Sequence, residues 1–393
     1  MAIQGNVCEG TLENRGMGQG TVNDRQLISK MVHDCSSCGE CLRDCSFLQF
    51  YGTPAVIAGR GKAESNLLSA FSCSLCGLCD AVCPELLSPS SMFLEMRREA
   101  VSKGLLDLTP YSPWLHYETL GSSCIFKRHF IPEGCNTVFF PGCSLAGTRP
   151  EAVKNLFAVL LKFEPTAGLV LDCCGKISHD LGLSDRFERV IDVLSRGLQD
   201  SGVTRILTAC PGCSKILRKY GSGFEVLSVY EVILEGKWSG AKGQNSSHIG
   251  SPAPRPLTPV LIHDPCPARF DHAQQQAVRQ LVSAAGYEPR ELPFSGPHTR
   301  CCGNGGMVEA CHRGAVAREP EIIMQMAEGA LVVSSCAACC DALSGNRGAA
   351  VHLADLIFGS HLSFKAKTPS SAGRWLNRLL LRISPLPSSE ERR

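Results

Sequence analysis

Residues 73–84 read CSLCGLCDAVCP, and residues 35–45 read CSSCGECLRDC. Both stretches have three cysteines separated by two residues and a fourth cysteine after three more residues. Pro84 follows the fourth cysteine of the later stretch, whereas Ser46 stands at that place in the earlier one. The chain has 23 cysteines among its 393 residues. Two stretches of the same spacing in so cysteine-rich a chain predict that these thiols act together as metal ligands.

Thiolates with this spacing wrap a short loop around one face of a [4Fe–4S] cube and leave its fourth iron to a cysteine of the other motif. We therefore expect two cubane clusters, each with three ligands from one motif and one from the other. The expected sets are Cys35, Cys38, Cys41 and Cys83 for the first cluster, and Cys73, Cys76, Cys79 and Cys45 for the second. Structural zinc is the alternative, but zinc sites typically use two Cys-x2-Cys pairs.

The residues around the two motifs have helical patterns. An amphipathic stretch runs from residue 63 to 71, and another helix is expected over 91–103 with Ser90 or Ser91 as its N-cap. The two motifs are also further apart than in a compact ferredoxin of the ββα type. These features favour an α-helical, two-cluster ferredoxin-like domain over residues 29–108.

Past residue 135 the pattern changes to short apolar runs that each end near a cysteine. The runs at 138–140, 169–171 and 206–207 are typical of buried strands, and amphipathic helical patterns lie between them. Alternating strands and helices predict a parallel sheet, in which the carboxyl ends of the strands meet at one edge. Five cysteines should therefore meet at that edge: Cys143, Cys173, Cys174, Cys210 and Cys213.

The same pattern occurs again after the apolar runs at 260–262 and 331–333. Its cysteines keep the order of the first set: Cys266, Cys301, Cys302, Cys336 and Cys339. This repeat predicts an internal duplication, with α/β cysteine-rich domains at 135–235 and 260–362 and a Gly-, Ser- and Pro-rich linker at 236–259. The expected fold class is thus α+β multidomain. Structural zinc or disulfides in both halves are the alternative interpretation of these cysteines.

Two ferredoxin motifs followed by two Cys…Cys-Cys-Gly…Cys-x2-Cys repeats resemble the D-type iron–sulfur chain of heterodisulfide reductases, over about residues 30–360. The iron–sulfur subunits of glycolate oxidase and anaerobic glycerol-3-phosphate dehydrogenase have the same plan. The resemblance implies that each set of five cysteines binds a non-cubane [4Fe–4S] cluster and that the second set holds the active one. Two departures lie beside that set. Pro267 stands where relatives often have histidine, and Met307 interrupts their usual glycine run.

The resemblance also implies an oxidoreductase subunit that passes electrons through the two cubanes to the cysteine-rich domains, where a small-molecule or protein disulfide is reduced or formed. The alternative is an electron-conduit subunit of a flavin-dependent dehydrogenase, of the glycolate, lactate or glycerol-3-phosphate type, that delivers electrons to the quinone pool. His263 and His298 lie near the second set and could supply protons to a leaving thiolate. The alternative is that both are packing or loop histidines.

Charge and hydropathy narrow the expected partners and location. The net charge of +2 gives no reason to expect nucleic acid. Because no nucleotide-binding glycine loop follows an apolar strand, we expect neither flavin nor NAD on this chain. We therefore expect its redox partner to be a flavoprotein or a membrane cytochrome b-type subunit. The polar tail at residues 1–28 lacks a secretory signal, and no apolar run reaches the ~20 residues that span a bilayer, so we expect a cytoplasmic protein.

The C-terminal segment, residues 363–393, is basic and amphipathic. We expect its apolar side chains on one helical face with arginines beside them: Trp375, Leu376, Leu379, Leu380 and Ile383, with Arg374, Arg378 and Arg382. Such a helix suits an anionic membrane surface or a groove on a partner, and would bring residues 365–393 into peripheral contact with the inner face of the cytoplasmic membrane. The alternative is a terminal helix packed on the core of its own chain.

Overall fold

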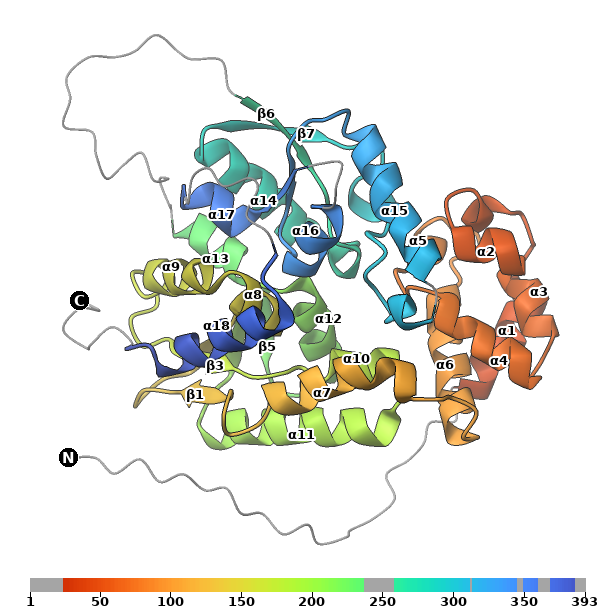
Figure 1. The fold of residues 1–393 in the computed structure, drawn as a ribbon, viewed down its shortest axis with the longest axis horizontal. Helices are drawn as coiled ribbons and strands as arrows, with labels where there is room; N and C mark the ends of the chain where they lie inside the picture. Colours follow the sequence, from red (N-terminus) through yellow and green to blue (C-terminus); the bar gives the residue numbers. More distant parts are fainter. Residues whose placement is uncertain (1–23, 237–257, 312, 345–348, 360–367, 386–393) are drawn as a thin grey trace, which may run out of the picture.

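The computed structural model describes residues 24–236, 258–311, 313–344, 349–359 and 368–385. Helices that carry the two ferredoxin motifs lie at one end of the molecule, and two α/β domains lie next to them (Figure 1). Three expected segments fall largely outside the described residues. They are the N-terminal tail, the linker from 237 to 257, and both ends of the basic C-terminal segment.

The motif-bearing region contains helices and loops but no strand among its described residues, 24–127. Its α-helices are α1 (Asp24–Asp34), α2 (Ser46–Tyr51), α3 (Pro54–Gly59), α4 (Glu64–Ser69), α5 (Leu78–Ala81), α6 (Pro89–Ser102) and α7 (Ser112–Gly121). Leu67, Met92 and Phe93 are buried between these helices and hold both cysteine loops on one apolar core. The prediction of a helical region, rather than one of the ββα type, is confirmed.

The predicted start of α6 is wrong by two residues. The helix begins at Pro89 rather than Ser91, with Ser88 at the N-cap position. Proline suits the first helical position because it has no N–H group that would need a partner. The Asp80 carboxylate accepts the Ser90 N–H at 2.8 Å, so a residue of the preceding helix α5 takes the role expected of a serine cap.

The first α/β domain is built on a five-stranded sheet in the order β1-β3-β2-β4-β5, with only β1 antiparallel to its neighbour. Its strands are β1 (Arg128–Phe130), β2 (Thr137–Phe140), β3 (Gly168–Leu171), β4 (Arg205–Thr208) and β5 (Glu225–Ser228). Its helices are α8 (Cys143–Thr148), α9 (Pro150–Leu160), α10 (Lys176–Asp180), α11 (Ser184–Asp200), α12 (Pro211–Tyr220) and α13 (Val229–Glu235).

The second α/β domain repeats this plan with a four-stranded parallel sheet in the order β7-β6-β8-β9. Its strands are β6 (Thr258–Ile262), β7 (Tyr287–Glu291), β8 (Val332–Ser334) and β9 (Ala350–His352). Its helices are α14 (His272–Ala284), α15 (Arg313–Met326), α16 (Ala337–Leu343) and α17 (Leu353–Ile357). The order matches β3-β2-β4-β5 of the first sheet strand for strand, which confirms the predicted duplication.

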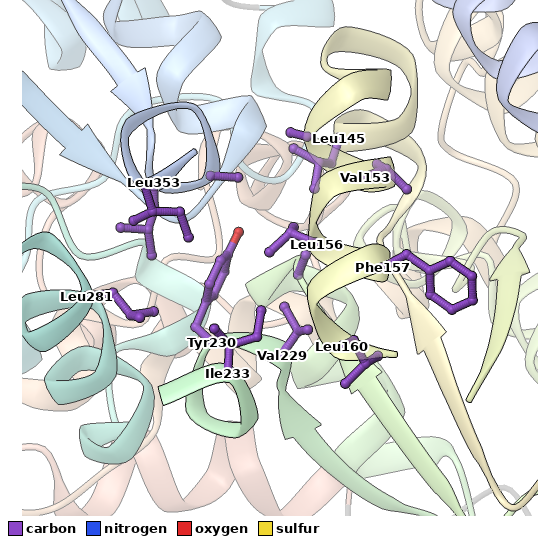
Figure 2. Close-up of a cluster of buried hydrophobic side chains, with 14 of the residues drawn as sticks. Leu145, Val153, Leu156, Phe157, Leu160, Val229, Tyr230, Ile233, Leu281 and Leu353 are labelled. Atoms are coloured by element: carbon purple, nitrogen blue, oxygen red, sulfur yellow. The ribbon is translucent and has the colours of Figure 1, made fainter. Parts of the chain in front are cut away.

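The two α/β domains share one hydrophobic core. Helices α9 and α13 of the first domain lie against α14 and α17 of the second, with Leu156, Tyr230, Leu281 and Leu353 fully buried between them (Figure 2). Burial of each leucine side chain stabilises the fold by about 1.5–3 kcal/mol. Because side chains of both domains belong to this one core, the domains form one packed unit.

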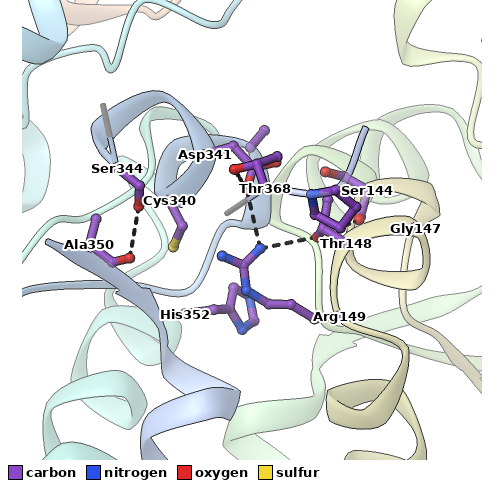
Figure 3. A network of polar contacts seen from close by, with 12 residues as sticks. Ser144, Gly147, Thr148, Arg149, Cys340, Asp341, Ser344, Ala350, His352 and Thr368 are labelled. Atoms are coloured by element: carbon purple, nitrogen blue, oxygen red, sulfur yellow. Dashed lines mark hydrogen bonds and ion pairs between the residues drawn. The ribbon is translucent and has the colours of Figure 1, made fainter. Parts of the chain in front are cut away.

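Ion pairs extend this interface between the α/β domains. Arg149, which directly precedes α9, pairs with Asp341 of α16 at 3.4 Å (Figure 3). It also pairs with Asp355 of α17 at 2.8 Å. Cys340 is buried beside this network, and its thiol donates to the Ser334 carbonyl at 3.7 Å.

The C-terminal helix α18 (Ser371–Ile383) packs against α8 of the first domain (Figure 1). Arg378 of this helix is buried, whereas Leu376, Leu380 and Ile383, three of the apolar residues expected to share a face, are exposed. The helix thus packs on its own chain and leaves these apolar side chains at the surface, so contact of this segment with a membrane or a partner stays a prediction. None of the helices in the described part of the chain is long and apolar enough to cross a membrane.

Candidate functional site

The parallel strands of the first α/β domain end at its cysteines. Strand β2 leads to Cys143 at the start of α8, β3 leads to Cys173 and Cys174, and β4 leads to Cys210 at the N-cap of α12. Gly142 precedes the first of these residues with a φ of 83°, and a Cβ at this position would lie 2.7 Å from the Cys210 Cβ. Glycine is thus required where the cysteine loops come together.

The five cysteines of this domain form one cluster of side chains, which we call the first array: Cys143, Cys173, Cys174, Cys210 and Cys213. The thiols of Cys143 and Cys173 interact, and the Cys213 thiol interacts with those of Cys174 and Cys210. The structure therefore brings together all five residues expected at this edge of the sheet.

The cysteines of the second α/β domain form the second array: Cys266, Cys301, Cys302, Cys336 and Cys339. Cys302 Sγ lies 3.2 Å from Cys339 Sγ. The Cys301 thiol interacts with Cys266 and Cys302, and the Cys339 thiol with Cys336. None of the described cysteines forms a disulfide. All five expected residues again lie together.

The two ferredoxin motifs exchange their fourth cysteines in space. One cavity is lined by Cys35, Cys38, Cys41 and Cys83, and another by Cys45, Cys73, Cys76 and Cys79. These are the two ligand sets expected from the sequence. The sets differ in their surroundings, because Cys38 of the first is exposed whereas Cys73 and Cys79 of the second are buried.

The second ferredoxin cavity opens directly onto the second array. Cys301 lines this cavity, and its thiol interacts with that of Cys76. The backbones also meet, since a Cβ on Gly306 would lie 2.7 Å from the Cys73 carbonyl oxygen. Sequence reasoning missed this junction. Its only signal is the glycine pair before Met307, which permits so close an approach.

Two buried arginines fasten the second ferredoxin loop to the α/β domains. Arg97 of α6 donates to the carbonyl oxygens of Cys73, of Asp180 at 2.6 Å and of Gly306 at 2.9 Å. Arg269 donates to the Cys76 carbonyl at 3.2 Å and to residues of the loop before Cys301. Hydrogen bonds from charged donors are about twice as strong as neutral ones, so these arginines hold the junction in place.

The two histidines considered as proton donors differ in their surroundings. His263 is buried, with Nδ1 3.4 Å from the Ser334 hydroxyl and Nε2 3.3 Å from the Arg300 carbonyl oxygen. His298 lies on an exposed loop. The environment of His263 is that of a packed histidine with both ring nitrogens engaged.

Two thiols of the ferredoxin motifs, those of Cys41 and Cys45, have raised pKa values. Burial raises the pKa of the Cys41 thiol to about 11, and the neighbouring Cys35 and Cys38 add to the shift. Burial also raises the pKa of Cys45 to about 12, with a further contribution from Cys76. Iron binds the thiolate, so metal binding at these residues must release their protons.

The donor sets fit iron–sulfur clusters better than a single metal ion. Among the described residues, no group of three or more His, Cys, Asp or Glu side chains converges closely enough to hold one ion. Each ferredoxin set instead surrounds a cavity, and each array draws its thiols from three loops. Thiolates arranged in this way suit a cluster of several irons, each of which takes its own ligand.

A basic cavity of about 420 Å³ opens where the ferredoxin-like region and the two α/β domains meet. Cys76 and Cys266 line it on one side, and Lys215, Arg218 and Lys219 of α12 on the other. Four cationic side chains line the cavity against two carboxylates, Asp80 and Asp271. The basic cavity therefore attracts anions to the neighbourhood of the second array.

Polar and aromatic side chains complete the basic cavity. The Ser214 hydroxyl is buried in its wall and has no hydrogen-bond partner among the described residues. Phe270, which also lines the cavity, is 62% exposed. Arg218 pairs with Asp271, whereas Lys215 and Lys219 are exposed to solvent. The cavity thus offers two lysine charges, a hydroxyl donor and an apolar surface to a small molecule.

Comparison with known protein families agrees with this geometry. Residues 31–87 match the 4Fe-4S dicluster domain, and residues 137–218 and 260–344 each match the cysteine-rich domain. The chain is therefore an iron–sulfur protein that combines one dicluster domain with two cysteine-rich domains.

Characterised relatives define the type of iron–sulfur protein more closely. The chain is similar to the D subunit of dihydromethanophenazine:CoB–CoM heterodisulfide reductase from Methanosarcina mazei, with 23% identity over 340 residues that cover 71% of this chain and 79% of the relative. The same protein of Methanosarcina acetivorans is 23% identical over 337 residues, covering 71% and 79%, and that of Methanosarcina barkeri is 22% identical over 343 residues, covering 70% and 78%. The expected resemblance is confirmed. The chain thus resembles the D subunit of heterodisulfide reductases over most of its length.

Proposed function

We propose that this chain conducts electrons from the dicluster domain to the second array, where a disulfide is reduced or, in the reverse direction, formed. Reduction takes up two electrons and two protons and breaks one S–S bond to give two thiols. A flavoprotein or a membrane cytochrome b-type subunit is the proposed source of the electrons. When bound, the clusters supply one-electron transfer along this path.

The proposed ligands follow the cavities and arrays. Cys83 joins the first ferredoxin motif and Cys45 joins the second, so that each cavity holds one cubane. Each array of five thiols is the proposed site of a further, non-cubane [4Fe–4S] cluster. The double thiolates of Cys173–Cys174 and Cys301–Cys302 suit neighbouring irons of one cluster.

The observation that carries this proposal is the contact between Cys76 and Cys301. It joins a ligand of the proposed second cubane to the second array, without an intervening side chain. The first ferredoxin cavity lies nearer the surface, since Cys38 is exposed. This order supports electron entry at the first motif and exit at the second array.

The basic cavity supports a small anionic disulfide or thiol as the substrate. It is lined by Cys266 of the second array, and it also touches Cys76. Lys215 and Lys219 would bind a carboxylate, sulfonate or phosphate group, and the Ser214 hydroxyl would donate to it. Phe270 would pack on the aliphatic part of the same molecule.

The test begins with anaerobically purified protein carrying its clusters. We expect about sixteen irons per chain, four for each of four sites. The protein is then mixed with 3,3′-dithiodipropionate, an anionic disulfide, or with cystamine, a cationic one, and EPR spectra are recorded. The anionic disulfide should produce a new signal at lower concentration than cystamine. The double variant Lys215→Ala/Lys219→Ala should remove this preference, whereas Lys162→Ala, an exposed lysine outside the cavity, should keep it.

Two other results would overturn the proposal. About eight irons per chain and no response to either disulfide would confine the clusters to the dicluster domain. Sixteen irons without a disulfide response would indicate an electron conduit, in which another subunit of a flavin-dependent dehydrogenase carries out the chemistry.

A further inference from the structure

Arg378 of α18 is a buried cation whose hydrogen bonding is incomplete. Its side chain lies against the end of α7, where Nη2 donates to the Gly121 carbonyl at 2.9 Å. The guanidinium also lies over the rings of Tyr117 and Trp375, with its central carbon 5.2 and 5.0 Å from their centroids. Its Nη1 is buried and has no partner among the described residues. Burying a charged donor without an acceptor costs free energy, so a ligand that accepts a hydrogen bond from this nitrogen would stabilise the site.

The unpaired nitrogen belongs to a side chain that borders the first array. Arg378 and Cys143 line the same small cavity, together with Gly142 and Asp172. The Asp172 carboxylate is already engaged, since its two oxygens contact the Cys173 N–H at 2.7 Å and His129 Nε2 at 2.9 Å. The anionic group left to face Arg378 is therefore the thiolate of Cys143, with which it has an electrostatic interaction.

The fold holds the guanidinium in this position. A Cβ on Gly121 would lie 2.7 Å from Nη1, so a glycine leaves the room that Arg378 occupies. Tyr117 donates to the Cys143 carbonyl at 3.0 Å and thereby places the aromatic platform beside the array. Arg374 and Asn377 anchor α18 on either side, through Asp341 at 3.1 Å and the Gly147 carbonyl at 2.8 Å.

We propose that the C-terminal helix completes the first array, with Arg378 donating from Nη1 to the thiolate-bound cluster there and raising its reduction potential. The inference rests on the proposed function, because it requires a cluster at the first array. A cation near a cluster favours the more negatively charged, reduced state, and hydrogen bonds to its sulfur atoms act in the same direction. The helix α18 lies outside the segments that match the dicluster and cysteine-rich domains.

The test compares three variants of the full-length protein carrying its clusters. Arg378→Gln removes the charge, Arg378→Lys keeps it without the planar fork, and Arg374→Gln removes a neighbouring arginine of the same helix that is paired with Asp341. The readouts are iron content and an EPR-monitored redox titration. The first-array signal is identified as the one that Cys173→Ser/Cys174→Ser abolishes.

We expect Arg378→Gln to shift the first-array potential to more negative values, Arg378→Lys to shift it less, and Arg374→Gln to leave it unchanged. Gly121→Ala should act like Arg378→Gln, because it displaces the guanidinium. Loss of first-array iron in Arg378→Gln alone would also support the role. An unchanged potential at full iron content, or the same iron loss in all three arginine variants, would overturn it. A wild-type protein without first-array iron would instead contradict the proposed function.

Discussion

His352 makes the stability of the second cysteine-rich domain depend on pH. It is the N-cap of α17, where Nδ1 accepts the Ala354 N–H at 3.2 Å, and its Nε2 is buried without a partner among the described residues. Burial, followed by the charge of Arg149, lowers the pKa of this imidazole from 6.5 to about 3. The folded state therefore requires a neutral ring.

The sign of the pH dependence follows from this lowered pKa. Between pH 6.5 and 3 the unfolded chain binds a proton that the folded chain does not, so the stability falls as the pH falls through this range. From pH 7.5 to 5.5 the loss is about 1.4 kcal/mol for this one group. His352→Asn keeps a capping side chain but cannot titrate. Its free energy of unfolding should therefore fall by that much less than the wild-type value over the same pH range. His298→Asn, which replaces an exposed histidine of the same domain, is the control. Equal pH profiles for His352→Asn and wild type would contradict this account.

At the scale of elements, the loop that carries Gly305 and Gly306 decides how closely the second array approaches the dicluster domain. Gly306 has a φ of 61°, and a Cβ there would lie 2.7 Å from the Cys73 carbonyl oxygen and 3.0 Å from Arg97 Nη2. Both the backbone conformation and the lack of space exclude a side chain. Met307, which has a φ of 52°, ends the glycine pair.

Gly306→Ala should loosen this junction. Gly329→Ala is the matched control, because Gly329 has a φ of 83° but nothing within 4 Å of the added methyl group. The control measures the cost of the backbone strain alone, roughly 1 kcal/mol. We expect Gly306→Ala to lower the free energy of unfolding by about 1–3 kcal/mol more than the control, and to slow the reduction of the second array after the dicluster domain is reduced. Stopped-flow reduction and chemical unfolding give both values. The same effect from the two alanines would show that the loops do not meet as described.

The junction between the dicluster domain and the second array is a feature that the sequence alone does not predict. Cysteine spacing predicts the helical dicluster region and the duplicated sheets, because ligand spacing and strand periodicity are local properties. The contact between Cys76 and Cys301 depends on how two domains dock, and no local pattern encodes this docking. For a related reason, the amphipathic pattern of α18 does not reveal which side chains of the helix face the core. Arg378 is buried because it finds a carbonyl, two aromatic rings and an unfilled cavity, whereas Leu376 has no such surface to pack on. The assignment of individual cysteines to clusters stays a prediction.

At the scale of the whole molecule, Arg97 joins all three domains. It is completely buried and donates to the Ala70 carbonyl at 3.0 Å and to the Cys73 carbonyl in the dicluster domain, to the Asp180 carbonyl in the first cysteine-rich domain, and to the Gly306 carbonyl in the second. Its guanidinium also lies over the Phe71 ring, 4.9 Å from the centroid. Burial lowers its pKa, although the neighbouring Cys73 and Asp180 oppose the shift. The carbonyl acceptors from three domains offset the cost of burying the charge.

Arg97→Met should therefore weaken the docking of the dicluster domain as well as the stability of the chain. It has a similar length but leaves four carbonyl oxygens without a donor, at a cost of about 3–5 kcal/mol. Arg97→Lys keeps the charge and should cost less, because an ammonium group retains some of these bonds although it cannot reach acceptors on so many sides.

The control is Arg98→Met. Arg98 pairs with Glu95 on the same helix, and breaking this partly exposed pair costs about 1 kcal/mol or less. Chemical unfolding measures the stability, and limited proteolysis of the native protein reports whether the dicluster domain separates. If Arg97→Met behaved like Arg98→Met in both measurements, the three domains would be held together by their apolar cores, and the four hydrogen bonds of Arg97 would contribute little.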